Sequence, residues 1–296
     1  MSWIYYIIFI FLVISSSVNC LDFDSDIGFG IRLDQFQWSI ASPDGHDDVI
    51  SELTLKDLCM YEVKAALKIV PFSHINLRLK GDYARIFSGK NQGSDYLESR
   101  GNKEFLRSIS DADKGEAFDF SAALGYQSTW FNRSFTFNPL IGWSHHELHL
   151  KAPSVNQSLN LFGPTGTFLG LHSDFKAIWN GPWVGIDGAV SLIPCWSIKG
   201  TIEYHWVLFK GSGLWNLRDD YLRDFKQSAY GRGTCITLGT QYAWNCFLVG
   251  LEYDFIYMKA SHGFDRIYTV FGNGTTRLNE ACWQSMSLLG TVALVF

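Results

Sequence analysis

Hydrophobic and polar residues alternate with a period of two along most of this chain. This period is the signature of a β-strand, because successive side chains point to opposite faces of the pleat. The pattern is clearest in residues 280–296, which end on Phe296 and whose apolar face holds Met286, Leu288, Val292 and Leu294. We therefore expect a closing strand, either of a membrane β-barrel or of a secreted β-sandwich.

Nine earlier segments repeat the alternation with the same polarity, at residues 27–33, 59–69, 75–83, 118–126, 135–143, 184–192, 198–208, 236–244 and 247–257. The sequence therefore predicts ten strands, with residues 280–296 paired to residues 26–41.

The connections alternate between short and long. Short turns are expected at residues 71–73, 131–134 and 194–195 and near Asn245, whereas residues 88–115, 151–170, 211–228 and 260–279 are expected to be long loops. Short turns on one side, long loops on the other and an even number of antiparallel strands are typical of outer-membrane barrels. Strands longer than the roughly 9–11 residues needed to span a bilayer predict a wall that projects on the long-loop side.

Charged residues fall on the strand face opposite the aromatic residues. A Lys or Arg that faced lipid at mid-membrane would cost roughly 2–4 kcal/mol. We therefore expect this face to line a polar, nearly charge-balanced lumen, with these residues in it: Arg32, Asp34, Glu62, Lys64, Lys68, Arg78, Lys80, Asp82, Asp119, Asp187, Lys199, Glu203, His205, Glu252 and Asp254.

Composition agrees with export and with one large domain. The 296 residues are 47% hydrophobic and 16% aromatic, with a net charge of −5 that argues against a nucleic-acid partner. The apolar stretch at residues 3–14 resembles the core of a signal peptide, so residues 1–20 are expected to be removed and residues 21–296 to form the barrel. Cleavage after Cys20 and lipidation of Cys20 both remain open.

Several short motifs resemble the Protochlamydia outer membrane protein family and, more distantly, the omptin family of outer-membrane proteases. They are residues 51–58 (SELTLKDL), residues 124–127 (LGYQ), Phe175-Lys176 before residues 183–186 (WVGI), and Phe296. The first resemblance implies an integral barrel of a bacterial outer membrane, with long loops outside and proposed porin activity. The second implies a ten-stranded barrel with an endopeptidase at its extracellular rim. The terminal Phe296 resembles an assembly signal.

The omptin resemblance is weakest at the catalytic positions. Omptins pair two acidic residues on one rim loop with an Asp-His couple on another, so that a water can be deprotonated. The matching loops here offer Asp95 and Glu98, without the family's Asp-x-Asp spacing, and Asp219 and Asp220, without a histidine. We interpret these four residues as solvated loop charges and expect no omptin-type catalysis.

Histidines and cysteines suggest little metal chemistry. His145, Glu147 and His149 share one strand face and could form a metal site, but an interfacial role is favoured, and we expect no metal and no cofactor. Cys195 and Cys246 are expected at short turns on one rim, available for disulfides within the barrel or to neighbouring envelope proteins.

Three functions remain open on these grounds: a porin or porin-like structural protein, a rim endopeptidase, and a catalytically inactive relative that acts as a surface adhesin. The expected partners are outer-membrane lipid, the barrel-assembly machinery, and a homo-oligomeric or disulfide-linked envelope protein.

Overall fold

The structure, a computed structural model, describes residues 22–42, 48–72, 74–98, 103–131, 134–214, 222, 224–270 and 272–294. Every regular element in these residues is a β-strand, and they contain no helix long and apolar enough to cross a membrane. The predicted signal peptide and assembly signal, at residues 1–20 and Phe296, lie outside the described residues.

Twelve strand segments follow one another along the chain: β1 (Asp22–Ala41), β2 (Val49–Phe72), β3 (Ile75–Tyr96), β4 (Glu104–Asp111), β5 (Gly115–Tyr126), β6 (Ser128–Trp130), β7 (Phe135–Asn160), β8 (Gly166–Ile193), β9 (Trp196–Leu214), β10 (Phe225–Trp244), β11 (Phe247–Thr269) and β12 (Gly272–Leu294).

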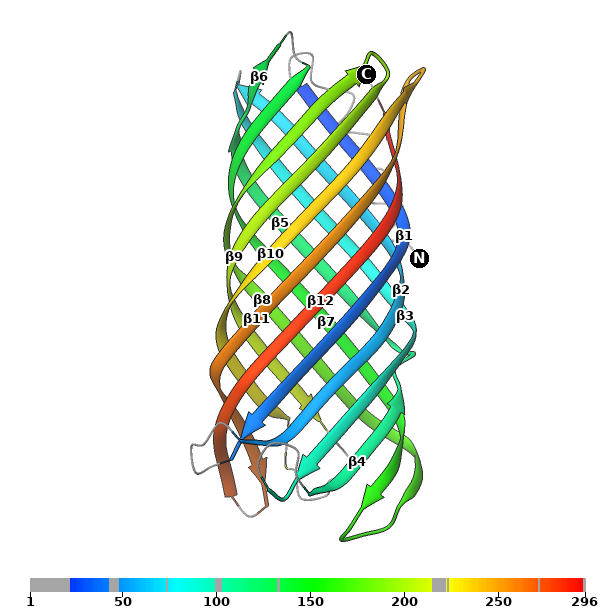
Figure 1. The fold of residues 1–296 in the computed structure, drawn as a ribbon, viewed down its shortest axis with the longest axis vertical. Coiled ribbons are helices and arrows are strands. Elements are labelled where there is room, and N and C mark those ends of the chain that lie inside the picture. Colours follow the sequence, from blue (N-terminus) through cyan, green and yellow to red (C-terminus); the bar gives the residue numbers. More distant parts are fainter. Residues whose placement is uncertain are drawn as a thin grey trace.

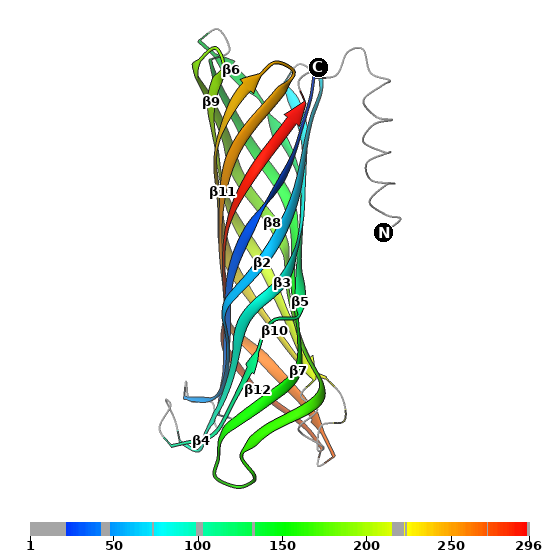
Figure 2. The ribbon, with the colours of Figure 1, turned by 90° about the vertical axis from the view of Figure 1, so that its right-hand side faces the viewer.

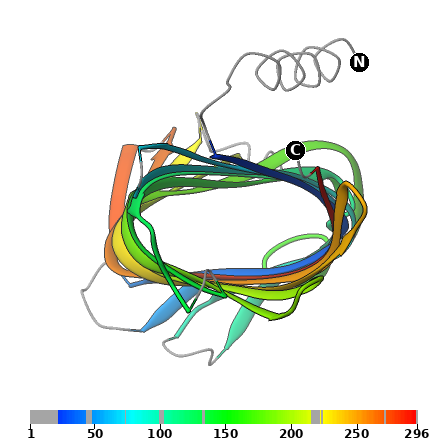
Figure 3. The same cartoon turned by 90° about the horizontal axis from the view of Figure 1, so that it is seen from above.

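These segments close into a barrel with ten antiparallel strand positions, and we call each position a stave. Both β4 and β5 pair with β3 on one side and β7 on the other, and β6 also pairs with β7, so these three segments form one interrupted stave. The ring closes where β1 pairs with β12, with Ile27 opposite Val292. Figures 1 and 3 show the tilted staves and their flattened, closed cross-section. The predicted all-β, ten-stranded, omptin-like barrel is confirmed.

Tight turns join the staves at one end, the upper end in Figure 1. Residues 194–195 link β8 to β9, and residues 245–246 link β10 to β11. Asn245 adopts φ 55°, a left-handed conformation that Asn tolerates better than most residues and that a two-residue hairpin requires. The predicted short turns at residues 194–195 and near Asn245 are therefore present, and those at residues 71–73 and 131–134 include residues outside the described part of the chain.

The predicted long loops are mostly wrong, because strands occupy much of them. β3 continues to Tyr96, and β4 lies within the segment expected to be a loop; β7 and β8 are separated by residues 161–165, and β11 and β12 by residues 270–271. Figure 2 shows the β7–β8 hairpin reaching furthest at the lower end of the barrel, opposite the tight turns. We call this end the mouth. Where the wall projects into water its outer face is polar, so these segments lack the apolar face that marked the strands in the sequence, although the backbone strands continue.

The outer surface carries an apolar belt near the short turns. On β1, Phe29, Ile31 and Leu33 point outward and are 63%, 43% and 48% exposed. Further along the same face, Gln35 and Gln37 are exposed instead. An exposed apolar belt of this kind is what a membrane barrel presents to lipid.

The inner face changes in the opposite sense at the same level. Arg32 and Asp34 point inward on β1 and are followed by Phe36 and Trp38, and all four are buried. The strand therefore reverses its amphipathicity while the same alternate positions keep facing inward: apolar outside and charged inside near the short turns, polar outside and apolar inside near the mouth.

The same reversal occurs on other staves. On β9, Glu203 and His205 point inward and are followed by the buried Val207 and Phe209, while Lys210 is exposed outside. The expectation of a polar lumen therefore fails in the mouth half, where interior side chains are apolar. Alternation alone could not reveal this, because it fixes which residues share a face and not what surrounds that face.

A charge placed in the apolar belt should destabilise the barrel. We expect Ile31→Lys to lower the free energy of unfolding by about 2–4 kcal/mol, since the ammonium group would face lipid. Gln37→Lys, on the same face of β1 beyond the belt, should change it by less than about 1 kcal/mol. Urea titration of protein folded in lipid vesicles measures both values, and equal losses would contradict the assigned position of the bilayer.

Candidate functional site: the closed interior and the mouth

Arg32 forms the centre of an ion-pair cluster inside the ring. Its Nε lies 2.9 Å from Asp34 Oδ1, and its Nη1 lies 2.6 Å from Asp119 Oδ2, 3.1 Å from Asp82 Oδ1 and 3.6 Å from Glu62 Oε1. The guanidinium of Arg32 is 1% exposed. Four carboxylates from four different staves thus converge on one cation.

Two lysines connect further staves across the lumen. Lys64 on β2 lies 2.8 Å from Glu252 and 2.5 Å from Asp254, both on β11. Lys199 on β9 lies 2.8 Å from Glu252 and 3.1 Å from Asp26 on β1. Because β2 and β11 are not neighbours in the ring, these pairs cross its interior.

Arg78 forms a third cluster with Asp187, at 2.6 Å, and with Glu203. Its guanidinium also lies 4.9 Å from the ring centroid of Trp183. Glu203 contacts His205 as well, with 3.1 Å between Glu203 Oε2 and His205 Nε2. Removing one partner from such a buried set leaves an uncompensated charge and typically costs about 3–5 kcal/mol.

The two remaining lysines expected in the lumen lie on the same inner faces. Lys80 lines a cavity of about 60 Å³ inside the ion-pair clusters, together with Arg32 and Lys64. Lys68 is partly buried on β2. Fourteen of the fifteen residues expected in the lumen therefore take part in these ion pairs or line this cavity.

Aromatic side chains fill the interior between the ion pairs and the mouth. The ring centroids of Phe36 and Phe175 are 5.2 Å apart, those of Trp179 and Phe209 are 4.6 Å apart, and Phe175 stacks on Phe225 at 6.2 Å. These side chains come from β1, β8, β9 and β10 and belong to one buried apolar cluster. This aromatic layer fills the interior between the charged layer and the mouth.

A pocket of about 160 Å³ lies at the mouth, on the side of the aromatic layer that faces away from the charged layer. Trp38, Phe225 and Ile267 form apolar parts of its wall, and serines and carboxylates line the rest; the polar lining residues are Ser51, Glu52, Asn91, Ser94, Asp95, Ser108, Ser110, Gln157, Ser173 and Asp265. We call it the mouth pocket. Its net acidic lining suits a ligand that carries positive charge.

The residues considered for proteolysis do not form one described site. Asp95 lines the mouth pocket, whereas Glu98 is exposed and pairs with Lys103. Asp219 and Asp220 lie outside the described residues. No histidine is among the described residues that line the mouth pocket.

The histidines of β7 divide between the two faces of the wall. His145 and Glu147 share the outer face as expected, with 3.6 Å between His145 Nε2 and Glu147 Oε2, and Lys176 lies 2.6 Å from Glu147. His146 points inward and is 5% exposed.

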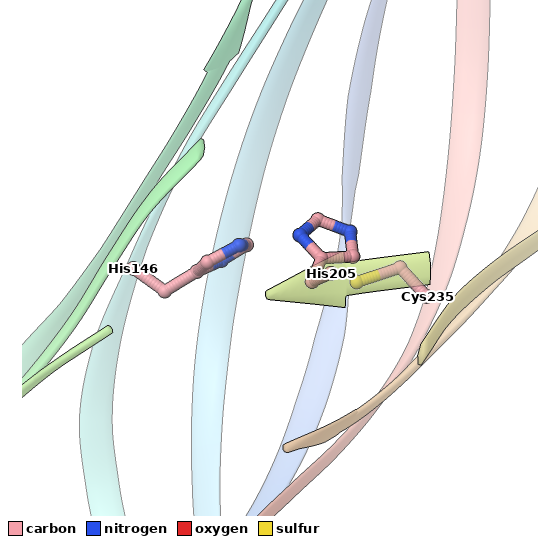
Figure 4. A group of neighbouring side chains, drawn as sticks. All are labelled: His146, His205 and Cys235. Carbon is pink, nitrogen blue, oxygen red and sulfur yellow. The ribbon is translucent and has the colours of Figure 1, made fainter. Parts of the chain in front are cut away.

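A potential ligand cluster, which sequence reasoning missed, forms around His146. Its imidazole approaches His205 of β9 and Cys235 of β10 (Figure 4), and one ligand atom from each of the three lies within 4.8 Å of the others. The alternation in the sequence already places all three residues on the lumen face. The sequence does not show that they lie at the same height in the barrel, because that depends on the register between staves that are distant in sequence.

Cys195 and Cys246 lie on two of the tight turns and are exposed, and neither forms a disulfide in the structure. A covalent link through these thiols stays a prediction.

The model of the Protochlamydia outer membrane protein family matches residues 26–296. The chain belongs to this family. A search of curated proteins gave no match.

The Protochlamydia-type barrel also resembles solved structures. The outer membrane protease OmpT of Escherichia coli superimposes with a TM-score of 0.77 at 12% identity, covering 95% of this chain and 99% of that chain. The translocator domain of the autotransporter NalP from Neisseria meningitidis gives a TM-score of 0.38 at 9% identity, covering 96% and 93%. The first likeness establishes an omptin-like fold, and with the family it places the protein in a bacterial outer membrane.

Asp265 in the mouth pocket should make the stability depend on pH. It is 3% exposed, and burial raises its pKa from 3.8 to about 6. Since the folded state favours the neutral acid, its ionisation destabilises the fold as the pH rises from about 4 to about 6. Asp265→Asn should therefore be more stable than the wild type near neutral pH, by up to about 3 kcal/mol, and equally stable below about pH 3.5.

Urea unfolding at both pH values measures this difference. The exposed Asp111, which pairs with Lys90, provides the control substitution Asp111→Asn, and its effect should stay below about 1 kcal/mol. A wild type that is as stable as Asp265→Asn near neutral pH would show that Asp265 is not held in a dry environment.

Proposed function

We propose that this member of the Protochlamydia outer membrane protein family is a closed barrel that serves as a structural and binding protein of the cell surface, without conducting solutes. The observation that carries this proposal is the double closure of the lumen. Paired charges around Arg32, Lys64 and Arg78 fill the half near the short turns, and the aromatic layer fills the half near the mouth.

Barrel size supports the same proposal. Barrels of about eight strands have interiors that side chains can fill, and open aqueous channels are found at about sixteen strands. Ten staves leave an interior that the described side chains span: Lys64 reaches Asp254, and Arg78 reaches Asp187. The projecting wall and its mouth pocket then offer a water-facing surface for a ligand.

The competing proposal is a porin, which the family resemblance implies. The cavity of about 60 Å³ within the ion-pair clusters favours it, because charged side chains line this cavity. Conduction would also require Phe36, Phe175 and Phe209 to move apart.

A rim endopeptidase is the third proposal, and the likeness in fold to OmpT favours it. Asp95 would be its acidic residue at the mouth. The mouth pocket has no described imidazole that could serve as a general base.

Planar-bilayer recording tests the first proposal directly. The full chain, refolded and checked by the slower gel mobility of its denatured form, should give no conductance steps above baseline, while an open sixteen-stranded porin added to the same bilayer should give them. Stable, size-limited steps from the folded protein would overturn the closed-barrel proposal in favour of a porin. Cleavage of a dibasic peptide by the same sample would favour the endopeptidase.

A further inference from the structure

The ligand cluster of His146, His205 and Cys235 lies where the charged and aromatic layers of the interior meet. Cys235 is directly opposite Glu203 in the β9–β10 ladder, and His205 is opposite Gly233. Toward the mouth, the next inward residue of β9 after His205 is Val207, which belongs to the apolar cluster. The cluster thus joins three staves at the boundary between the two layers.

Both imidazoles are held by carboxylates on one side. His146 Nδ1 lies 2.9 Å from Asp119 Oδ1, and His205 Nε2 lies 3.1 Å from Glu203 Oε2. A carboxylate keeps the proton on the nitrogen that it contacts, so the other nitrogen presents a lone pair. Carboxylate–histidine pairs are the usual outer support of a histidine that binds a metal ion.

The ring nitrogens that do not contact a carboxylate, His205 Nδ1 and His146 Nε2, differ in their present contacts. His205 Nδ1 contacts the hydroxyl of Ser144 at 3.0 Å, which can give way to an ion. His146 Nε2 is buried and has no hydrogen-bond partner among the described residues. A buried lone pair without a partner is unfavourable, since it has lost water and gained nothing in exchange. Figure 4 shows the His146 ring extending toward His205 and Cys235.

Space for an ion and a further ligand adjoins the cluster. His146, Cys235 and Glu203 all line the cavity of about 60 Å³. Arg32 and Lys80 line it too, but Arg32 is neutralised by its own carboxylates, of which Asp119 lies at 2.6 Å. A water molecule in this cavity could complete the coordination of an ion held by three side chains.

We propose that His146, His205 and Cys235 bind one borderline-soft divalent cation of the Zn²⁺ class. Two imidazoles and one thiolate are ligands that zinc prefers, at about 2.0–2.1 Å for nitrogen and 2.3 Å for sulfur. Tetrahedral binding would bring the ligand atoms to about 3.3–3.6 Å from one another, a closure of at most about 1.5 Å from the present limit of 4.8 Å. The bound ion links β7, β9 and β10 and so braces the junction of the two layers.

Cobalt is the probe for the first test, because a thiolate bound to Co²⁺ gives a charge-transfer absorption. The full chain, refolded in detergent and freed of metal by a chelator, is titrated with Co²⁺ and is also refolded in its presence, in case the closed interior slows access. The wild type should bind one Co²⁺ per chain with the thiolate band and tetrahedral visible bands, and Zn²⁺ should displace it. Zn²⁺ should also raise the melting temperature.

Variants distinguish this cluster from other thiols. Cys235→Ser should abolish the thiolate band, and His146→Asn, whose amide nitrogen can take the place of Nδ1 and still donate to Asp119, should weaken Zn²⁺ binding at least tenfold. Cys282→Ser, a partly buried cysteine on β12, is the control and should behave like the wild type. Each variant is first shown to fold by gel mobility.

Two results would overturn the proposal. One is a folded wild type without a thiolate band after both titration and refolding with Co²⁺. The other is a band or a Zn²⁺-dependent melting shift that persists unchanged in folded Cys235→Ser.

Discussion

The fixed alternation of side chains along a β-strand is the constraint on which this barrel depends. A stave that keeps its alternation as it passes from lipid into water, as β1 does from Arg32 to Trp38, must change its outward residues from apolar to polar at that height. Other staves shift their alternation at bulges: on β2 the buried positions are Leu58 and Met60 on one side of the bulge and Leu53 and Leu55 on the mouth side. On β1 the change falls between Leu33 and Gln35 outside, and between Asp34 and Phe36 inside. The interior compensates: ion pairs fill it where the belt is apolar, and aromatic rings fill it where the outer face is wet. The barrel therefore combines the inverted pattern of a membrane protein with the ordinary core of a soluble one.

This stacking gives each layer a separate role. The charged layer needs every partner, because carboxylates such as Asp34 and Asp119 are buried and tolerable only beside Arg32. The aromatic layer excludes water and supports the floor of the mouth pocket. Trp283 joins the two, since its Nε1 donates a hydrogen bond to Asp34 at 2.9 Å while its side chain belongs to the apolar cluster. His146, His205 and Cys235 lie at the same junction. A lumen filled by a charged layer and by an aromatic layer favours a surface role over solute passage.

The sequence was sufficient to predict the ten staves and the inward side of residues such as Arg78 and Glu252, because both follow from the alternation of odd and even positions. The tight turns near residues 194–195 and Asn245 and the closure of β1 on β12 followed from the lengths of the connections and the even number of strands. The sequence was not sufficient for the height of one stave against another, and that is why the approach of His146 to Cys235 was missed. The strands at residues 104–111 and 151–160 were mistaken for loops, since polar residues dominate where the wall projects into water. Phe36 and Trp38 had the inward parity of Arg32, but a uniformly polar lumen was assumed.

Thiol labelling along β8 tests the reversal most directly. Ala177 points into the aromatic layer and is 0% exposed, while the neighbouring Lys176 is 40% exposed on the outer face. In a chain whose native cysteines are replaced by serine, a small, charged thiol reagent should label the cysteine introduced by Lys176→Cys rapidly. It should leave the one introduced by Ala177→Cys unlabelled until the barrel is denatured. Rapid labelling at position 177 in the folded protein would mean that water fills the mouth half of the lumen, and it would contradict a closed interior.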